Sequence, residues 1–355
     1  MQIRGGAALP FFAADRPYVR VGIRDELKTL GIGEATPWPA ESSSSIEQMA
    51  RMLGEALSNL GRVDLDELPP LEAVVRALEP VETLLAPWKT ARLALETALL
   101  DAVMQRLGQP LANSLTPQPL DVVPCNALLD ASKDDLGQRA GELSAQGFTA
   151  LKVKLRARDD VAFAREVQAL RELRQVWPGE LRLDPNGMWT VEEARQKLVI
   201  LAELRPRYVE QPVPADHLID LGATACPWAA DESLLVPGLA KQLVEKSDCV
   251  AFILKPALLG GFSKALELAY LAKREGISAI VTHALDGPVG IAAATEMARA
   301  VANEGDACGL DQHAGLSRYP SLTMPHHVRA GYVTRANQPG LGFSEEDRKR
   351  WLTMA

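Results

Sequence analysis

Acidic and basic side chains recur at the ends of short apolar segments in the second half of the chain. Three such segments end in a carboxylate, at Asp184 in RLD, Glu210 in YVE and Asp231 in WAAD. Lysines hold the equivalent place before and after them, at Lys154 in ALKVKL and Lys255 in FILK. Three hard oxygen donors without a neighbouring histidine or cysteine suit Mg²⁺ or Mn²⁺ and do not suit zinc. The pattern predicts a divalent-metal site flanked by lysine-bearing strands.

The segment ALKVKL carries two lysines at alternate positions. In a strand, Lys152 and Lys154 point to one face and the apolar residues fill the other. Burial and a nearby dication both lower the pKa of a lysine, and a neutral lysine is a general base. We expect Lys154, nearest the strand end, to be this base. Lys152 would hold the carboxylate of a ligand or lower the pKa of Lys154 by like-charge repulsion.

Removal of a proton next to a carboxylate is the chemistry that fits these groups. The proton is weakly acidic, and its loss gives a doubly charged enediolate that a divalent cation stabilises. Lys255 would approach from the side of the barrel opposite Lys154, as a second acid/base or as a fixed cation. A single aspartate at a strand end is more often a turn former or a helix cap. The prediction therefore depends on finding all of these groups at successive strand ends.

A regular series of strands and helices is needed to position these side chains. From about residue 120 onward, short β-like runs alternate with amphipathic segments, which predicts an α/β protein with a (β/α)₈ TIM-type barrel. The active site of such a barrel lies at the carboxyl ends of its strands. The expected strands are 122–128, 150–155, 181–184, 207–210, 226–231, 249–255, 277–282 and 306–310.

The first third of the chain has a different pattern. Strand-like runs broken by turn signals fill residues 1–36, and helical apolar spacing follows them. We predict an N-terminal α+β capping domain at 1–115 and a catalytic barrel at 116–317. The tail at about 318–355 is expected to pack back on the capping domain. The serines at 42–45 are expected to cap a helix.

Composition excludes several kinds of partner. The 355-residue chain has a formal net charge of −8, which argues against nucleic acid or an anionic membrane as partner. No apolar run reaches membrane-spanning length, and no secretory signal is evident. The four cysteines are scattered without zinc-like pairing, so a cytoplasmic location is the default expectation. A small-molecule carboxylate is the expected partner, and the sequence predicts no oligomeric state.

The ordered motifs KVK, DPN, EQP, DES and LKP followed by GG resemble the muconate-cycloisomerase-like branch of the enolase superfamily. The resemblance extends over essentially the whole chain. Within that branch, GEATPWP, VPCNALL and ILKPALLGG are most similar to the o-succinylbenzoate synthases. This resemblance implies a Mg²⁺-assisted syn dehydration of a succinyl-hydroxycyclohexadiene carboxylate to 2-succinylbenzoate, a step of menaquinone biosynthesis.

The resemblance also implies a role for each group. Asp184, Glu210 and Asp231 would be the metal ligands. Lys154 would remove the α-proton and then protonate the departing hydroxide, while Lys255 would stabilise the enediolate as a cation. Expected substrate contacts are Asn186, Gly260, Thr282 and His283.

Other reactions fit the same residues. Lys154 and Lys255 could act as an acid/base pair on opposite faces of an N-acylamino acid or a dipeptide, in a racemase or an epimerase. Asp311 stands alone where dipeptide epimerases of the family usually have an aspartate pair, which weakens that interpretation. Cycloisomerisation of a muconate is a third reading, and a barrel that binds a metal or ligand without catalysis is a fourth. The discriminating regions are the loop around 11–20 and the seventh and eighth strand ends.

Overall fold

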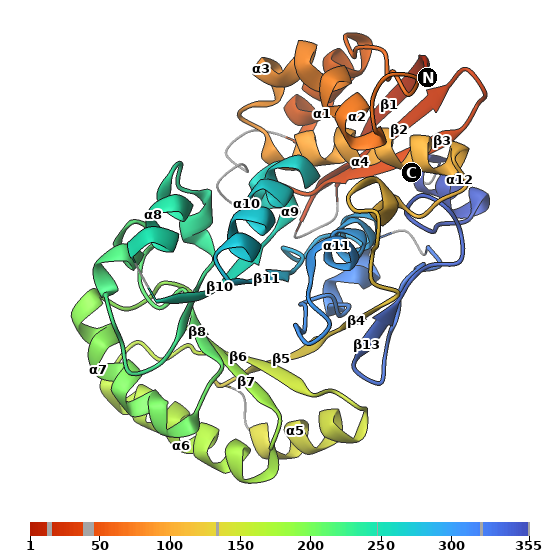
Figure 1. Ribbon diagram of the computed structural model, residues 1–355. Helices are drawn as coiled ribbons and strands as arrows, with labels where there is room; N and C mark the ends of the chain where they lie inside the picture. The colour runs from red at the N-terminus through yellow and green to blue at the C-terminus, as the bar shows by residue number, and fades with distance from the viewer. Residues whose placement is uncertain (13–15, 38–45, 133–134, 247, 320–321, 354–355) are drawn as a thin grey trace.

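A curled parallel sheet with helices along its outer side makes up the larger part of the protein (Figure 1). The computed structural model describes all residues except 13–15, 38–45, 133–134, 247, 320–321 and 354–355. Neighbouring strands pair in the order β11-β10-β9-β8-β7-β6-β5. These strands are β5 (Asn126–Asp130), β6 (Ala150–Lys154), β7 (Glu180–Asp184), β8 (Tyr208–Glu210), β9 (Trp228–Ala230), β10 (Cys249–Leu254) and β11 (Ser278–Val281).

The eighth expected strand, at 306–310, is reduced to two bridge residues within the described part of the chain. Cys308 bridges to Cys125 beside β5, and Gly309 bridges to Thr282 at the end of β11. A side chain at position 309 would place its Cβ 2.5 Å from the Thr282 hydroxyl oxygen, so this close approach requires glycine. The expectation of eight regular strands is corrected to seven strands whose two edges both contact this segment.

The helices between the strands follow their sequence signals. The Asp159 side chain accepts a hydrogen bond from Ala162 N at the start of α6, and Thr190 forms a capping box with Glu193 at the start of α7. The sheet is covered by helices outside and filled by side chains inside, so its strands are buried on both faces. These helices are α5 (Leu136–Ala145), α6 (Asp160–Val176), α7 (Val191–Leu201), α8 (Leu239–Lys246), α9 (Pro256–Leu259), α10 (Phe262–Arg274) and α11 (Pro288–Val301).

The N-terminal part consists of an antiparallel sheet packed on the long helix α4 (Lys89–Arg106). Gly33 of the sheet faces α4 so closely that an added Cβ would lie 2.0 Å from Ala94 O. The GIG sequence therefore allows strand and helix to meet without a side chain between them. The other elements are β1 (Ile3–Phe11), β2 (Tyr18–Asp25), β3 (Leu30–Ala35), α1 (Ile46–Ser58), α2 (Pro70–Leu78) and α3 (Glu82–Leu85). The predicted serine cap at 42–45 lies outside the described residues.

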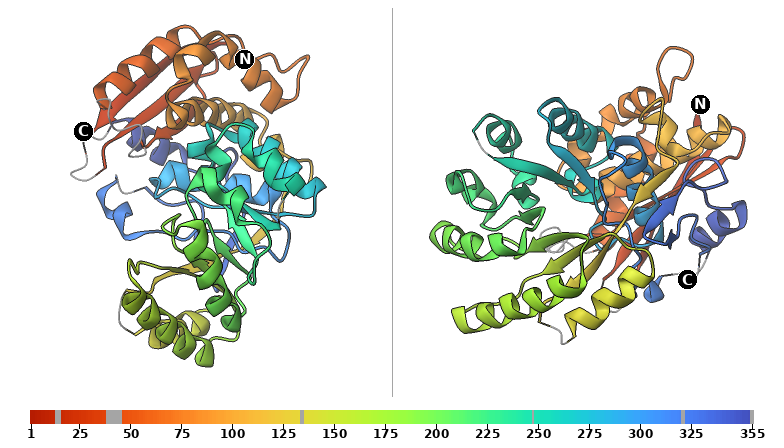
Figure 2. Two further views of the ribbon diagram at one scale, coloured as in Figure 1. Left: turned by 90° about the vertical axis from the view of Figure 1, so that its left-hand side faces the viewer. Right: turned by 60° about the horizontal axis from the view of Figure 1, so that its bottom comes forward.

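The C-terminal segment returns to the N-terminal sheet, against which its last helix packs (Figures 1 and 2). Helix α12 (Glu345–Thr353) contacts β2 and β3, and Trp351 Nε1 donates to Gly33 O at 3.2 Å. A small sheet of β4 (Val122–Pro124), β13 (Tyr332–Thr334) and β12 (Val328–Arg329) precedes this helix. The domain limits at 115 and 317 stay predictions.

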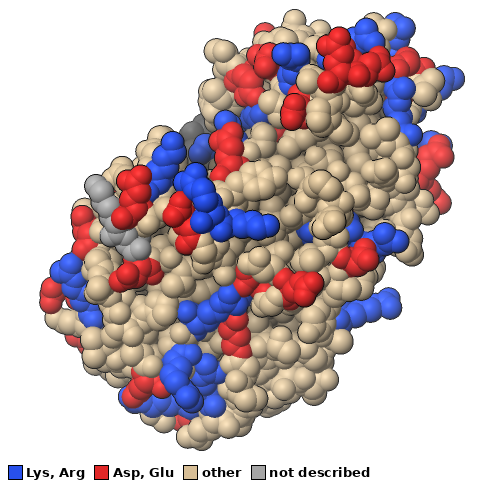
Figure 3. Space-filling view, in the orientation of Figure 1, with Lys and Arg blue, Asp and Glu red and all other residues tan. Residues whose placement is uncertain are grey.

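Charged groups of both signs are interspersed on the face of the molecule drawn in Figure 3. In the described part of the chain, no helix combines the length and the apolar character needed to cross a membrane. The expected absence of nucleic-acid and membrane partners stays a prediction.

Candidate active site

The carboxyl ends of five successive strands bring the predicted catalytic and metal-binding residues together. Asp184 and Glu210 are the last residues of β7 and β8, and Asp231 directly follows β9. Lys154 ends β6, where it pairs with Asp184 across the sheet, and Lys255 directly follows β10. The three carboxylates are buried, with Asp184, Glu210 and Asp231 only 0%, 1% and 4% exposed.

Each of these carboxylates contacts a lysine. Lys152 Nζ donates to Glu210 Oε1 at 2.5 Å and lies 2.8 Å from Asp184 Oδ2. Lys154 Nζ donates to Asp184 as well. Lys255 Nζ donates to Asp231. Because burial weakens the screening of charge, these six groups form a strongly coupled network.

The carboxylates raise the pKa values of two of these lysines. Burial lowers the pKa of Lys152, but Asp184, Glu210 and Asp231 outweigh it and the net shift is upward. The pKa of Lys255 is likewise raised, because Asp231 and Glu210 outweigh burial. The sequence expectation of a lowered pKa assumed a bound dication, and for the metal-bound site it stays a prediction. A cation bound to the carboxylates would offset their charge and leave burial to act on the lysines.

The pKa values of Glu210 and Asp184 are shifted in opposite directions. Burial, followed by the charges of Asp184 and Asp231, raises the pKa of Glu210 to about 8. The pKa of Asp184 is lowered: burial raises it, but Lys152 and Lys154 outweigh burial. Burial is the largest cause of the shift at Glu210, and the two neighbouring negative charges add to it. A divalent cation at these carboxylates would favour their charged forms.

The donor set fits a hard divalent cation, although the side chains do not converge as a ready-made centre. In the described ranges, no group of three or more His, Cys, Asp or Glu residues is arranged to hold a metal ion. The reason is that Asp184, Glu210 and Asp231 are each turned toward a lysine. All-oxygen ligands from three carboxylates are what Mg²⁺ prefers. These three residues would hold the ion once released from the lysines.

Gln211 is a site residue that the sequence analysis did not assign. Its carboxamide is buried and uses its full hydrogen-bonding capacity. Oε1 accepts from the backbone of Asp231 and Ser233 at 3.0 and 3.1 Å, and Nε2 donates to Val213 O and Ser233 Oγ at 2.9 and 2.8 Å. Its own backbone is left-handed, with φ 41°. Gln211 thus fixes the start of the DES segment, and its place within the EQP motif was the available sequence signal.

The four residues expected to bind substrate each interact with other groups of the protein. Asn186 Oδ1 accepts from Lys154 Nζ at 2.8 Å, so this residue orients the expected base. Gly260 O accepts from Arg92 of α4 at 2.7 Å, and Thr282 Oγ1 donates to Gly309 O at 3.1 Å. Both ring nitrogens of His283 contact backbone groups. Substrate contact by these four residues stays a prediction.

The family of the chain follows from a match that covers more than half of it. Residues 135–349 match the family described as "Enolase C-terminal domain-like". The chain therefore belongs to this family, and it is an enzyme of the enolase superfamily, whose members use acid/base catalysis.

Relatives with different named activities match at similar levels. The o-succinylbenzoate synthase of Thermobifida fusca is 33% identical over 250 residues, which are 66% of this chain and 75% of that protein. The L-Ala-D/L-Glu epimerase of Bacillus subtilis is 28% identical over 295 residues, 80% of this chain and 78% of that protein. These identities do not separate the two activities.

Some matches are partial. The chain matches only 13% of the length of the chloroplastic protein PHYLLO of Arabidopsis thaliana and 55% of the length of muconate cycloisomerase 1-2 of Acinetobacter lwoffii. A solved structure, the dipeptide epimerase from Methylococcus capsulatus complexed with Mg ion, aligns with TM-score 0.77 and 25% identity. That alignment covers 96% of this chain and 99% of the epimerase. The shared fold thus extends over nearly the whole molecule.

Proposed function

We propose that this protein is a Mg²⁺-dependent o-succinylbenzoate synthase. The arrangement of Lys154 and Lys255 on either side of three buried carboxylates supports proton removal next to a carboxylate, and the single Asp311 carries the choice of the dehydratase. We interpret the curled sheet, with its bridges at Cys308 and Gly309, as a closed (β/α)₈ barrel that holds a small carboxylate substrate at this end. A relative named o-succinylbenzoate synthase, matched over two thirds of the chain, supports this choice.

Lys154 carries out both proton transfers in the proposed reaction. Its amine takes the proton next to the substrate carboxylate, which leaves an enediolate. It then returns that proton to the hydroxyl group leaving from the same face, so one molecule of water is lost and the ring becomes aromatic. Asn186 keeps the Lys154 ammonium oriented through its 2.8 Å contact. Lys152 supplies a second positive charge beside Lys154 and the carboxylates.

Lys255 stabilises the enediolate as a fixed cation on the opposite side. It follows β10, four strands from β6 in the order of the sheet. Asp184, Glu210 and Asp231 would hold a divalent cation, for which we propose Mg²⁺ with Mn²⁺ as a substitute, and that ion would supply positive charge that stabilises an enediolate. The four described cysteines are free and buried, which agrees with the proposed cytoplasmic location.

Racemisation of an N-acylamino acid or epimerisation of a dipeptide is the second candidate. The placement of Lys154 and Lys255 on strands that face each other across the curl favours it, because inversion of a stereocentre needs an acid and a base on opposite faces. The epimerase relative matched over 80% of the chain also supports it. The single Asp311 after the eighth-strand segment favours the dehydratase.

A direct assay separates the two. Purified protein with Mg²⁺ is given the succinyl-hydroxycyclohexadiene carboxylate, and formation of the aromatic product is followed by absorbance. We expect turnover that EDTA abolishes, that Mg²⁺ restores, and that Lys154→Ala eliminates. Folded, Mg²⁺-supplied protein that leaves this substrate unchanged but exchanges the α-proton of a dipeptide for deuterium in D₂O would establish the epimerase instead.

A further inference from the structure

A cavity of about 350 Å³ lies where the turn between β2 and β3 meets the end of α4 and the C-terminal segment. Arg24 borders it from the end of β2 and Lys28 from the turn. Gln105 borders it from α4, and Gln338 and Lys349 border it from the C-terminal segment. We call it the turn cavity. Its volume lies within the range for small-molecule sites.

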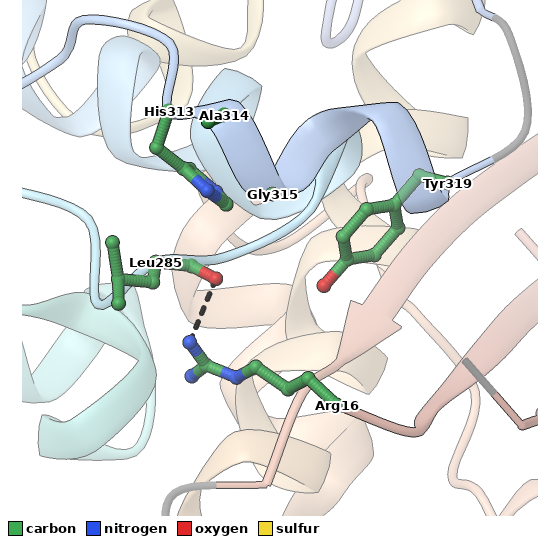
Figure 4. A pocket seen from close by; sticks show the side chains of 6 residues that line it. All are labelled: Arg16, Leu285, His313, Ala314, Gly315 and Tyr319. Atoms are coloured by element: carbon green, nitrogen blue, oxygen red, sulfur yellow. Dashed lines mark hydrogen bonds between the residues drawn. The ribbon is translucent and has the colours of Figure 1, made fainter. Parts of the chain in front are cut away.

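The turn cavity is separate from the candidate active site. The cavity drawn in Figure 4 is bordered by Arg16, Leu285 and His313, and it lies at the carboxyl end of the sheet. The lysines and carboxylates of the candidate active site lie at that same end. Among the described residues, none borders both cavities. A ligand in the turn cavity would therefore leave the place of the substrate free.

Hydrogen bonds fix the walls of the turn cavity. Asp25 Oδ1 accepts from Thr29 N at 2.7 Å, which sets the shape of the turn. Lys28 lies inside this turn with a left-handed backbone, at φ 65°. Gln105 Nε2 donates to Leu30 O at 2.9 Å and so joins α4 to the start of β3. These contacts form the cavity in advance of any ligand.

Positive charge predominates on the walls of the turn cavity. Its described charged residues are the cations Arg24, Lys28, Arg348 and Lys349 and the carboxylate Glu345. Arg348 is compensated by the buried Asp101, to which it donates. Lys349 is compensated by Glu345, whose Oε1 lies 2.5 Å from Lys349 Nζ. Lys349 also lowers the pKa of Glu345 the most, and the charge of Arg24 contributes less.

Two of the cations, Arg24 and Lys28, form no ion pair within the part of the chain that the structure describes. The acids next to them in the sequence are engaged elsewhere. Asp25 and Glu26 both pair with Arg106, at 3.2 and 2.7 Å. Neither of these acids borders the turn cavity. A ligand would therefore meet an excess of two positive charges there.

Two uncompensated cations in a concave site suit an anion that concentrates its charge on one group. A phosphate group carries about −1.5 to −2 at pH 7 and has three strong acceptor oxygens. A single carboxylate carries half that charge or little more. The ammonium of Lys28 and the planar guanidinium of Arg24 are both donors that phosphate oxygens accept from.

We propose that the turn cavity binds a small molecule that carries a phosphate group, with Arg24 and Lys28 as its cationic partners. Such a ligand would connect the β2–β3 turn with α12, and it would stabilise the folded protein because it binds that state. The inference is independent of the proposed function, since it uses no residue of the candidate active site.

Calorimetric titration with inorganic pyrophosphate, at constant ionic strength and without added Mg²⁺, tests the proposal. Lys28→Met and Arg24→Met should each weaken binding about five-fold or more. Glu345→Gln removes the carboxylate that competes for Lys349, and it should tighten binding about two-fold. Arg51→Met, at an exposed position of α1, is the matched control and should leave binding unchanged.

A second control is needed because pyrophosphate could also bind at the lysines of the active site. Binding that is lost in Lys154→Met but unchanged in Lys28→Met and Arg24→Met would overturn the proposal. Absence of binding to the wild type would overturn it as well. The tricarboxylate tricarballylate is the comparison anion, and if it binds as tightly as pyrophosphate, the assignment to phosphate is wrong. Circular dichroism verifies that each variant is folded.

Discussion

Single residues at the candidate active site divide between those that carry charge and those that hold the charged groups in place. Lys152, Lys154 and Lys255 supply the positive charge. Asn186 and Gln211 are neutral amides, but one contacts Lys154 and the other fixes the backbone of Asp231. Gln211 is buried and Asn186 is half-buried, and their contacts indicate that hydrogen bonds set the positions of the charged groups.

Exchange of each lysine for arginine separates the two proposed roles. Arginine keeps its proton in proteins and cannot act as a base. In the dehydratase, Lys154→Arg should lower kcat at least about a hundred-fold, because it removes a general base. Lys255→Arg keeps a cation and should lose much less. Steady-state assay of both variants is the measurement, and equally severe losses would favour the two-base epimerase.

Replacement of Gln211 should weaken cation binding, although Gln211 is not itself one of the proposed metal ligands. Gln211→Met removes both acceptor and donor and leaves the Asp231 and Ser233 backbone amides unpaired, at a cost of about 1–3 kcal/mol in unfolding free energy. Displacement of Asp231 should lower the affinity for Mg²⁺ about ten-fold. Calorimetric titration with Mg²⁺ and urea unfolding are the measurements. Gln168→Met on the exposed side of α6 is the control, and unchanged Mg²⁺ affinity would contradict the assigned role.

The sequence predicted which residues would gather at the site but not how they would pair. Strand ends are readable because Asp184, Glu210 and Lys255 each precede proline or a polar turn after an apolar run. The role of Gln211 depends on a left-handed backbone and on the neighbouring strand, which no local pattern contains. The upward pKa shift of Lys152 likewise depends on three carboxylates from other strands.

Two helices of the larger part have their N-terminal N–H groups bound by glutamates from the N-terminal part of the chain. Glu96 of α4 accepts from Phe262 N at 2.5 Å at the start of α10. Glu34 of β3 accepts from Val289 N and Gly290 N at 3.1 and 3.3 Å at the start of α11. A carboxylate at a helix N-terminus satisfies unpaired backbone N–H groups and complements the helix dipole. The capping domain is thus attached through the helices that follow β10 and β11.

The charge of Glu34 should make stability depend on pH. Burial, followed by the charge of Asp286, raises the pKa of Glu34 from 4.5 to about 7. Between these values the folded protein binds the proton more tightly than the unfolded chain does, so stability falls as pH rises. The full effect is at most about 3 kcal/mol. Urea unfolding of wild type and Glu34→Gln from pH 5 to 8 should show the wild type losing stability relative to the variant. A difference independent of pH would contradict this.

At the level of elements, sequence patterns located seven strands well and the eighth only in part. Apolar runs bounded by Gly or Pro placed β6 and β10 within a residue or two of their observed ends. The run at 306–310 reads like the others, but only Cys308 and Gly309 form bridges. Pairing of this segment depends on both edges of the sheet at once, and its close approach to Thr282 is a tertiary property.

At the scale of the whole molecule, a buried aspartate joins the tail to the N-terminal part. Asp101 of α4 accepts from Ile32 N in β3 at 3.1 Å and from Leu341 N in the tail at 2.8 Å. Arg348 of α12 donates to the same carboxylate. Three segments far apart in sequence therefore meet at one charge that is inaccessible to solvent.

Removal of Arg348 should test whether this junction stabilises the entire protein. Arg348→Met leaves the Asp101 carboxylate buried without its cation, and such changes cost about 3–5 kcal/mol. Lys349→Met removes an exposed ion pair with Glu345 on the same helix, and we expect a change below about 1 kcal/mol. Urea unfolding followed by tryptophan fluorescence and far-UV circular dichroism is the measurement. If the tail, cap and sheet unfold together, both signals should shift equally in Arg348→Met. A loss confined to one signal would show that the tail unfolds separately, and a loss no larger than that of Lys349→Met would show that the junction is unimportant for stability.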